Sequence, residues 1–245
     1  MLYHIVLCLC VKKGVIKVSK RIEKISKFVD KKRKYNITEA INIIKNTAIA
    51  KFDETIELHV KLGINVKDGD QIIRGTIILP YGTGRIKKIA VLAFGEKQKE
   101  AELAGADVVG YSDLINDISN SKLNFDILIA TPDTIKDLKN VAKILGPRNL
   151  MPNFKSDTIT SDIFNSVSEF KKGKIEYKSD SFGIIHIPVG KASFECDKII
   201  SNIKFFLKTI ENKKPPKLND QYIKNIAISS SMGVGVFIEN KKHTI

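Results

Sequence analysis

Two glycine-containing turns are the first candidates for chemistry in this chain. Gly82-Thr83-Gly84 is the only candidate for a phosphate-binding loop. It lacks the third glycine of a dinucleotide-binding fingerprint and the Lys-Ser/Thr pair of a P-loop, and a strand pattern follows it instead of a helix. Gly146-Pro147-Arg148 could hold an anion but is more simply interpreted as a structural loop. An enzyme that binds a nucleotide or sugar phosphate near Gly82–Gly84 stays open as the alternative function.

Histidines and cysteines offer no better catalytic site. His4, His59, His186 and His243 show no spacing typical of a metal site or of a histidine–carboxylate pair. The sequence contains no zinc-protease, nucleophile-elbow or paired-cysteine motif. Its three cysteines are too sparse for a disulfide framework. We therefore predict a protein that is not an enzyme and that uses no metal and no cofactor.

The charge favours a polyanionic partner. A formal net charge of +14 over 245 residues attracts nucleic acid or an anionic membrane surface. A solvated lysine-rich surface is the alternative. Residues 83–173 are nearly balanced in charge, so the excess lies in the two flanks. The apolar run Leu2–Val11 is too short to cross a membrane, and no other segment is long and apolar enough.

One strand and one loop in the basic flanks carry residues suited to RNA. In Thr55–Gly63, apolar residues alternate with Glu57, His59 and Lys61, which predicts a strand with one solvated face. A carboxylate such as Glu57 can accept a hydrogen bond from a ribose 2′-OH group. The segment Ser230-Ser231-Met232-Gly233 joins two predicted strands. Its small residues permit close approach of the backbone, and methionine supplies an adaptable apolar contact.

Two different patterns of secondary structure must position these residues. Continuous apolar strands such as Ile89–Phe94 and Phe125–Ala130 alternate with helices, which is typical of a doubly wound parallel sheet. The flanks carry half-solvated strands and a long amphipathic helix over Asp197–Glu211. The expected fold class is α/β with two domains. Residues 19–82 and 174–245 form a discontinuous basic α+β domain, and residues 83–173 form an inserted, Rossmann-like α/β domain.

The crossing points and the chain start complete this organisation. Glycines suit bending, so a hinge is predicted at Gly82, Thr83, Gly173 and Lys174. Residues 1–18 are set apart as an N-terminal extension, interpreted as an appendage or an overlong start, with a targeting peptide as the alternative. A basic amphipathic helix is predicted within Lys12–Lys34.

Several long motifs follow one another in order between Val18 and Ile238. Among them are Lys51–Gly63 (KFDETIELHVKLG), Arg74–Gly84 (RGTIILPYGTG), Ile144–Pro152 (ILGPRNLMP), Gly183–Phe194 (GIIHIPVGKASF) and Ser229–Gly235 (SSSMGVG). With these motifs the chain resembles the L-one family of large-subunit ribosomal proteins, of bacterial or organellar type.

The resemblance implies partners and site residues. It implies binding of large-subunit rRNA at the mobile stalk beside other ribosomal components, help in releasing deacylated tRNA from the E site, and repression of the chain's own mRNA. It also implies a monomer off the ribosome and a place in the cytoplasmic ribosome, with an organellar ribosome as the alternative. A basic translational regulator outside the ribosome would use the same RNA surface. The family's contact motifs fall on Phe52, Glu57, Ser231, Met232 and Gly233, with Lys51, Thr55, Lys61, His186, Lys191 and Ser230 as secondary candidates.

Overall fold

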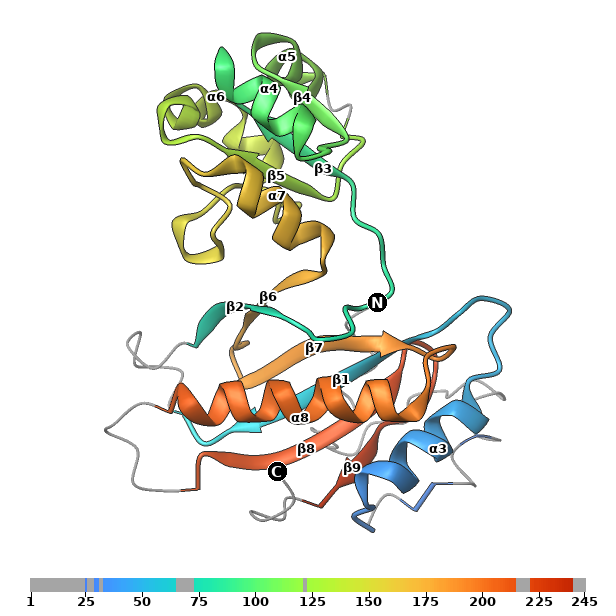
Figure 1. Cartoon of the computed structure of the whole chain (residues 1–245). Coiled ribbons are helices and arrows are strands. Elements are labelled where there is room, and N and C mark those ends of the chain that lie inside the picture. Colours follow the sequence, from blue (N-terminus) through green and yellow to red (C-terminus); the bar gives the residue numbers. More distant parts are fainter. Residues whose placement is uncertain are drawn as a thin grey trace. The chain divides into compact units, whose positions relative to one another are not determined.

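The computed structural model describes residues 25, 29–30, 33–64, 73–120, 123–214 and 221–239. The interpretations of residues 1–18 and of most of the basic helix in Lys12–Lys34 lie outside them. The chain divides into two compact units, seen in Figure 1. Unit 1 comprises Met1–Ile73, Leu79–Thr83 and Tyr177–Ile245, and unit 2 comprises Arg74–Ile78 and Gly84–Glu176. This division assigns Arg74–Ile78 to unit 2, whereas the sequence boundaries placed that segment in the discontinuous domain.

Unit 1 is built on a four-stranded antiparallel sheet with the order β7-β1-β8-β9. Helices α3 and α8 lie on one face of this sheet (Figure 1). The apolar residues of β1 are buried on the helical side, as their period of two predicts. The elements are α3 (Ile37–Thr47), β1 (Thr55–Leu62), β7 (Ile184–Lys191), α8 (Cys196–Asn212), β8 (Ile223–Ser230) and β9 (Val236–Ile238).

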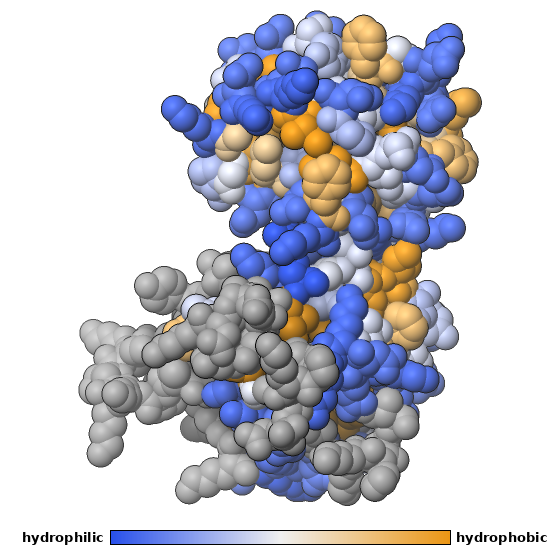
Figure 2. All heavy atoms as spheres, turned by 90° about the vertical axis from the view of Figure 1, so that its left-hand side faces the viewer, coloured by the Kyte–Doolittle hydropathy of each residue, from blue (hydrophilic) through white to orange (hydrophobic). Residues whose placement is uncertain are grey.

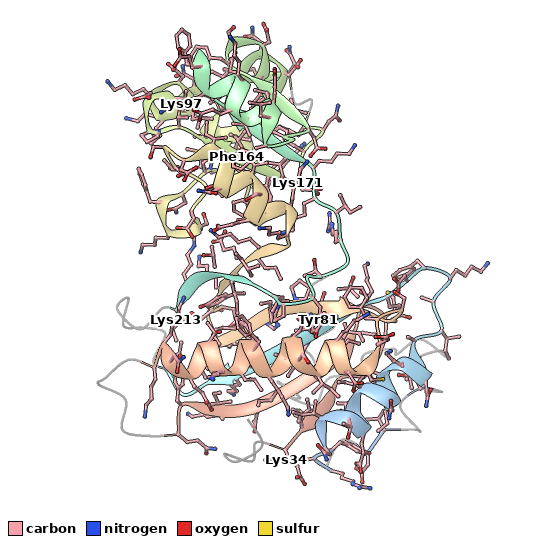
Figure 3. All side chains as sticks on the ribbon, viewed as in Figure 1. Lys34, Tyr81, Lys97, Phe164, Lys171 and Lys213 are labelled. Carbon is pink, nitrogen blue, oxygen red and sulfur yellow. The ribbon has the colours of Figure 1, made fainter. Side chains whose placement is uncertain are left out.

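A buried polar side chain of α8 holds the segment Leu79–Thr83 against this helix. Asn202 is fully buried, and its Nδ2 donates to the carbonyl oxygens of Gly82, at 3.1 Å, and Val189, at 2.8 Å. The backbone N–H of Tyr81 donates to Asn202 Oδ1 at 3.2 Å. Figure 3 shows Tyr81 beside this helix. These bonds satisfy backbone groups of the segment Leu79–Thr83, which has no strand of its own to do so.

Unit 2 contains a three-stranded parallel sheet with the order β4-β3-β5. Alternate residues of β3 enter two separate cores, which explains why its sequence is continuously apolar. Ala90 and Leu92 pack with α5 and α6, and Ile89 and Val91 pack with α4 and α7. The elements are β3 (Ile89–Leu92), α4 (Glu96–Leu103), β4 (Val108–Gly110), α5 (Ser112–Ser119), β5 (Ile127–Ala130), η2 (Pro132–Thr134), α6 (Ile135–Leu145), η3 (Phe154–Ser156) and α7 (Ile163–Lys171). Helices on both faces of parallel strands confirm the predicted α/β class.

A short two-stranded sheet completes the described structure. Strand β2 (Arg74–Ile78) pairs with β6 (Lys174–Lys178), and Arg74 Nε lies 2.5 Å from Glu176 Oε1. On the face seen in Figure 2, hydrophilic side chains cover much of the coloured surface, with apolar patches among them. None of the helices in the described ranges has the length and apolar character that crossing a membrane requires.

Candidate nucleic-acid interface

The face of β1 turned away from its apolar core positions carries Thr55, Glu57, His59 and Lys61. Glu57, Thr55 and Lys61 are half-buried, but His59 is only 3% exposed. The prediction that all the polar residues of this strand share a solvated face is therefore wrong at His59. The strand is central, with β7 on one side and β8 on the other. Side chains from both neighbours therefore enclose this residue, which alternation alone could not reveal.

His59 is paired with a second histidine across the sheet. In the register of β1 with β7, His59 lies opposite His186, and their Nδ1 atoms are 2.7 Å apart. One Nδ1 must carry the proton and the other must accept it. The other ring nitrogen of His59, Nε2, lies 2.9 Å from Ser229 Oγ. His186 Nε2 is 3.6 Å from Asp180 Oδ2.

These contacts set the charge on the strand face. Burial lowers the pKa of His59 to about 3, and a charge on His186 adds to that shift. His59 is therefore neutral at physiological pH. Burial also raises the pKa of Glu57, and His186 opposes this shift. His59 therefore adds no positive charge to the face, and Glu57 presents a partly desolvated carboxyl group, which suits hydrogen bonding to hydroxyls more than attraction of phosphates.

Two segments from opposite ends of the sequence meet at the start of β1. We name residues 50–54 the contact loop and residues 230–233 the serine–methionine turn. The backbone N–H of Ser231 donates to the Thr55 carbonyl at 3.0 Å. The Ser231 hydroxyl accepts from the Thr55 N–H at 3.1 Å and lies 3.2 Å from the Thr55 carbonyl oxygen. This hydroxyl is therefore used inside the protein, where it joins the turn to β1.

Each of the two segments presents one large apolar side chain to the outside. Phe52 in the contact loop is 53% exposed, and Met232 in the serine–methionine turn is 42% exposed. The turn is closed by the Gly233 N–H, which donates to the Ser230 carbonyl at 3.1 Å. Ser230 is buried, and its hydroxyl has no hydrogen-bond partner among the described residues, so it does not face a partner from outside. An added Cβ at Gly233 would lie well inside van der Waals contact of Ser230 Oγ, so a side chain here would force that hydroxyl or the turn to move.

Lysines border the contact loop. Lys51 is exposed, and Lys191 of β7 reaches across to the Thr55 hydroxyl at 3.1 Å and the Asp53 carbonyl at 3.3 Å. Lys45 donates to the Phe194 carbonyl from α3. Asp53 accepts from the backbone N–H of Ser193 at 3.1 Å and from its hydroxyl at 2.8 Å. The loop is therefore held by Lys191 of β7 and by Ser193 just after it, while Lys45 of α3 binds the same segment at Phe194.

The residues proposed as a hinge differ in their surroundings. Gly82 and Gly173 have φ values of 61° and 98°, which favour glycine. Thr83 is 5% exposed. Lys174 is buried, and its Nζ lies 2.9 Å from Asp157 Oδ2 and 2.8 Å from Glu169 Oε2. Burial lowers the pKa of Lys174, but hydrogen bonds to Glu169 and Asp157 outweigh it and leave the pKa raised.

The candidate phosphate loop lacks a helix to receive an anion. After Gly82-Thr83-Gly84 the chain runs without regular structure to β3 at Ile89. The Gly82 carbonyl is bound to Asn202. In the described part of the chain, no group of three or more His, Cys, Asp or Glu side chains could hold a metal ion.

Sequence reasoning missed Glu54, Asp53 and Asn202. Each binds backbone groups of segments far away in the sequence, and Glu54 is 1% exposed. An acidic residue before a strand has the same sequence pattern whether it is solvated or buried. The one available signal is the order Asp53-Glu54-Thr55 directly before an alternating strand, where side chains can bind loop backbone.

Comparisons with known proteins agree on one family. The model of the family described as "Ribosomal protein L1p/L10e family" matches residues 44–234. "Large ribosomal subunit protein uL1" of Thermosipho africanus is 47% identical over 224 residues, covering 91% of this chain and 97% of that protein. The protein of the same name in Thermosipho melanesiensis is 47% identical over 221 residues, covering 90% of this chain and 95% of that protein.

Proposed function

Because the chain belongs to the ribosomal protein L1p/L10e family, we propose that it is a structural constituent of the large ribosomal subunit that binds large-subunit rRNA through unit 1. The two relatives carry the name of a large-subunit ribosomal protein. A family of ribosomal proteins also agrees with the expectation of a protein that is not an enzyme.

One observation supports unit 1 as the RNA-binding part. At one end of β1 the Met232 N–H of the serine–methionine turn donates to Glu54 of the contact loop, and each segment exposes an apolar side chain, Phe52 or Met232. Exposure alone does not distinguish these two side chains, because others such as Ile86 are more exposed, but loops fixed by hydrogen bonds can hold them in one place for a partner. Such side chains can pack on ribose or on unstacked bases, which are the features that proteins read in folded RNA.

The surrounding polar residues supply the remaining chemistry. Lys51 and Lys61 are placed to contact phosphates, and Lys191 lies beside Thr55 at the edge of the same surface. Glu57, Thr55 and His186 can exchange hydrogen bonds with ribose hydroxyls. A half-buried carboxyl group would repel phosphates, so its presence favours recognition by ribose and shape over recognition by charge alone.

Filter binding across a salt series tests this proposal. The purified chain is titrated with a large-subunit stalk fragment and with a scrambled RNA of equal length. Each phosphate contact contributes roughly −0.7 to −0.9 to the slope of log affinity against log salt. We expect tight binding of the stalk fragment that persists at salt concentrations where the scrambled RNA has dissociated. Equal and equally salt-sensitive binding of both RNAs would show that the net charge of +14 attracts RNA without specificity, and would contradict the proposal.

Finer roles follow from the family alone. We propose that the chain acts in the cytoplasmic ribosome, assists release of deacylated tRNA from the E site, and represses its own mRNA, being a monomer when free. The mRNA role predicts that the leader of its message competes with the stalk fragment for one site. We further propose that the chain bends at the glycine hinge, between a discontinuous domain of residues 19–82 and 174–245 and an inserted domain of residues 83–173.

The alternative, a nucleotide or sugar phosphate enzyme, predicts a different result. Such a ligand would raise the melting temperature of the full chain in proportion to the logarithm of its concentration. We expect no shift, because Gly82–Gly84 is followed by irregular chain and strand β3 instead of a helix.

A further inference from the structure

Glu54 connects the two segments that carry the candidate RNA contacts. Its side chain is 1% exposed. Carboxylate oxygen Oε1 accepts from the Ala50 N–H at 3.0 Å, and Oε2 accepts from the Met232 N–H at 3.1 Å. The backbone carbonyl of the same residue accepts from the Ala192 N–H at 2.8 Å. One residue therefore binds the start of the contact loop, the serine–methionine turn and the chain after β7.

Burying the carboxylate of Glu54 costs free energy. Taking a carboxylate out of water is unfavourable, and hydrogen bonds from backbone N–H groups offset that cost. An apolar side chain would avoid that cost but would leave the amides of Ala50 and Met232 without these acceptors. Both bonded amides belong to segments that carry candidate RNA contacts. Met232 is itself an exposed candidate contact, and Ala50 starts the loop that carries Lys51 and Phe52.

We propose that Glu54 is a positioning residue of the RNA site, which sets the separation of Phe52 and Met232 by holding the amides of Ala50 and Met232 on its two carboxylate oxygens. This inference rests on the proposed function, because it concerns the same surface. Glu54 does not touch the RNA, since its side chain is enclosed. It acts through the two apolar side chains, and Ser231, bonded to Thr55, fixes the turn to β1 beside it.

The substitution Glu54→Gln isolates this role. Glutamine has nearly the same shape but only one acceptor oxygen, and its NH₂ group would face one of the two N–H donors. One loop or the other is then released. We expect a loss of specific affinity for the stalk fragment on the order of tenfold, with the slope of affinity against salt unchanged. The unchanged slope separates lost positioning from lost phosphate contacts.

A double-mutant cycle with Met232→Ala tests whether Glu54 acts through Met232. If it does, Glu54→Gln reduces affinity by less than about threefold once the methionine side chain is gone. Glu195→Gln is the matched control. It removes the same charge in unit 1 from a side chain that is 74% exposed and paired with Lys198 at 3.0 Å. We expect wild-type affinity in this control.

The outcomes separate this inference from the proposed function. If the wild type does not distinguish the stalk fragment from scrambled RNA, the proposed function fails. If the wild type does so and Glu54→Gln binds equally well, or if its effect is unchanged both in Met232→Ala and in Phe52→Ala, the positioning role is overturned. Should Glu54→Gln not fold, Glu54→Asp supplies the test, because it keeps the charge and both acceptor oxygens but is one methylene too short to hold both amides. We expect weakened specific binding in this variant as well, and wild-type affinity would overturn the inference.

Discussion

Gly233→Ala is the substitution whose effect can be worked out most directly from the structure. Gly233 closes the serine–methionine turn, and it is not among the described glycines with positive φ. A side chain there would therefore meet no torsional penalty. The added Cβ would overlap Ser230 Oγ, while Ser230 Cβ would stay at 3.5 Å, an ordinary contact. Ser230 Oγ is therefore the one atom with which the new Cβ would overlap.

That oxygen lies in a buried part of the turn. Ser230 is 2% exposed, and its hydroxyl has no hydrogen-bond partner among the described residues. Forcing extra volume into a packed site costs about 1–3 kcal/mol. Removing the hydroxyl should relieve the overlap, because the overlapping atom is then absent. The removal itself should cost little, because a buried hydroxyl without a partner contributes no hydrogen bond to lose. Gly233→Ala should therefore be destabilising, and Ser230→Ala combined with it should recover most of the loss.

Urea unfolding measures the stability, and binding of the stalk fragment measures the turn geometry. We expect Gly233→Ala to lower the free energy of unfolding by about 1–3 kcal/mol and to weaken specific binding. The double variant should restore both. Gly110→Ala is the matched control, because its new Cβ would lie 3.4 Å from Leu114 Cβ at a position without positive φ.

Two results would refute this reasoning. Wild-type stability of Gly233→Ala would mean that the turn can shift freely and does not need glycine. A double variant as unstable as the single one would mean that the overlap with Ser230 Oγ is not the cause. A loss in Gly110→Ala equal to that in Gly233→Ala would attribute the effect to glycine replacement in general.

Three further substitutions test other parts of the molecule. Met232→Asp should abolish specific RNA binding in a gel-shift assay while the melting temperature stays near that of the wild type, because it places a charge at an exposed apolar contact; retained affinity would remove Met232 from the site. Between pH 6.5 and about 3 the unfolded chain binds a proton that buried His59 does not, so stability falls as the pH falls through this window. His59→Gln should remove up to ~1.4 kcal/mol per pH unit of that slope in urea unfolding, and an unchanged slope would contradict the neutral imidazole. Lys174→Met should destabilise unit 2 by about 1–2 kcal/mol in thermal unfolding, because Asp157 and Glu169 lose their shared lysine but are partly solvated; no loss would show that this ion pair is inert.

The spacing of apolar residues and the distribution of charge along the sequence are sufficient to predict most of the fold. The buried parallel strand predicted over Ile89–Phe94 is present as β3, Ile89–Leu92, and its residues pack into two cores. The long helix predicted over Asp197–Glu211 is present as α8, Cys196–Asn212. Both predictions succeed because burial on both faces and burial on one helical stripe leave distinct patterns along the chain.

The site was less accessible to sequence reasoning. His59 follows the same alternation as Glu57 and Lys61, yet β7 and β8 enclose it, and pairing between distant strands leaves no mark on the period. Glu54 is buried by loops from residues far away in the chain, so its local sequence shows nothing unusual. The apolar contacts Phe52 and Met232 could be proposed from the family resemblance, but the hydrogen bonds that hold their loops could not.

The central place of β1 also has a consequence for synthesis of the chain. This strand is made early, but both of its neighbours, β7 and β8, come from the C-terminal part of the sequence. During translation its apolar face has no sheet to join until those strands have left the exit tunnel. The strands β3, β4 and β5 are close in sequence and can pair as soon as they emerge. Unit 2 is thus able to fold while the first strand of unit 1 waits, exposed to chaperones and to other nascent chains.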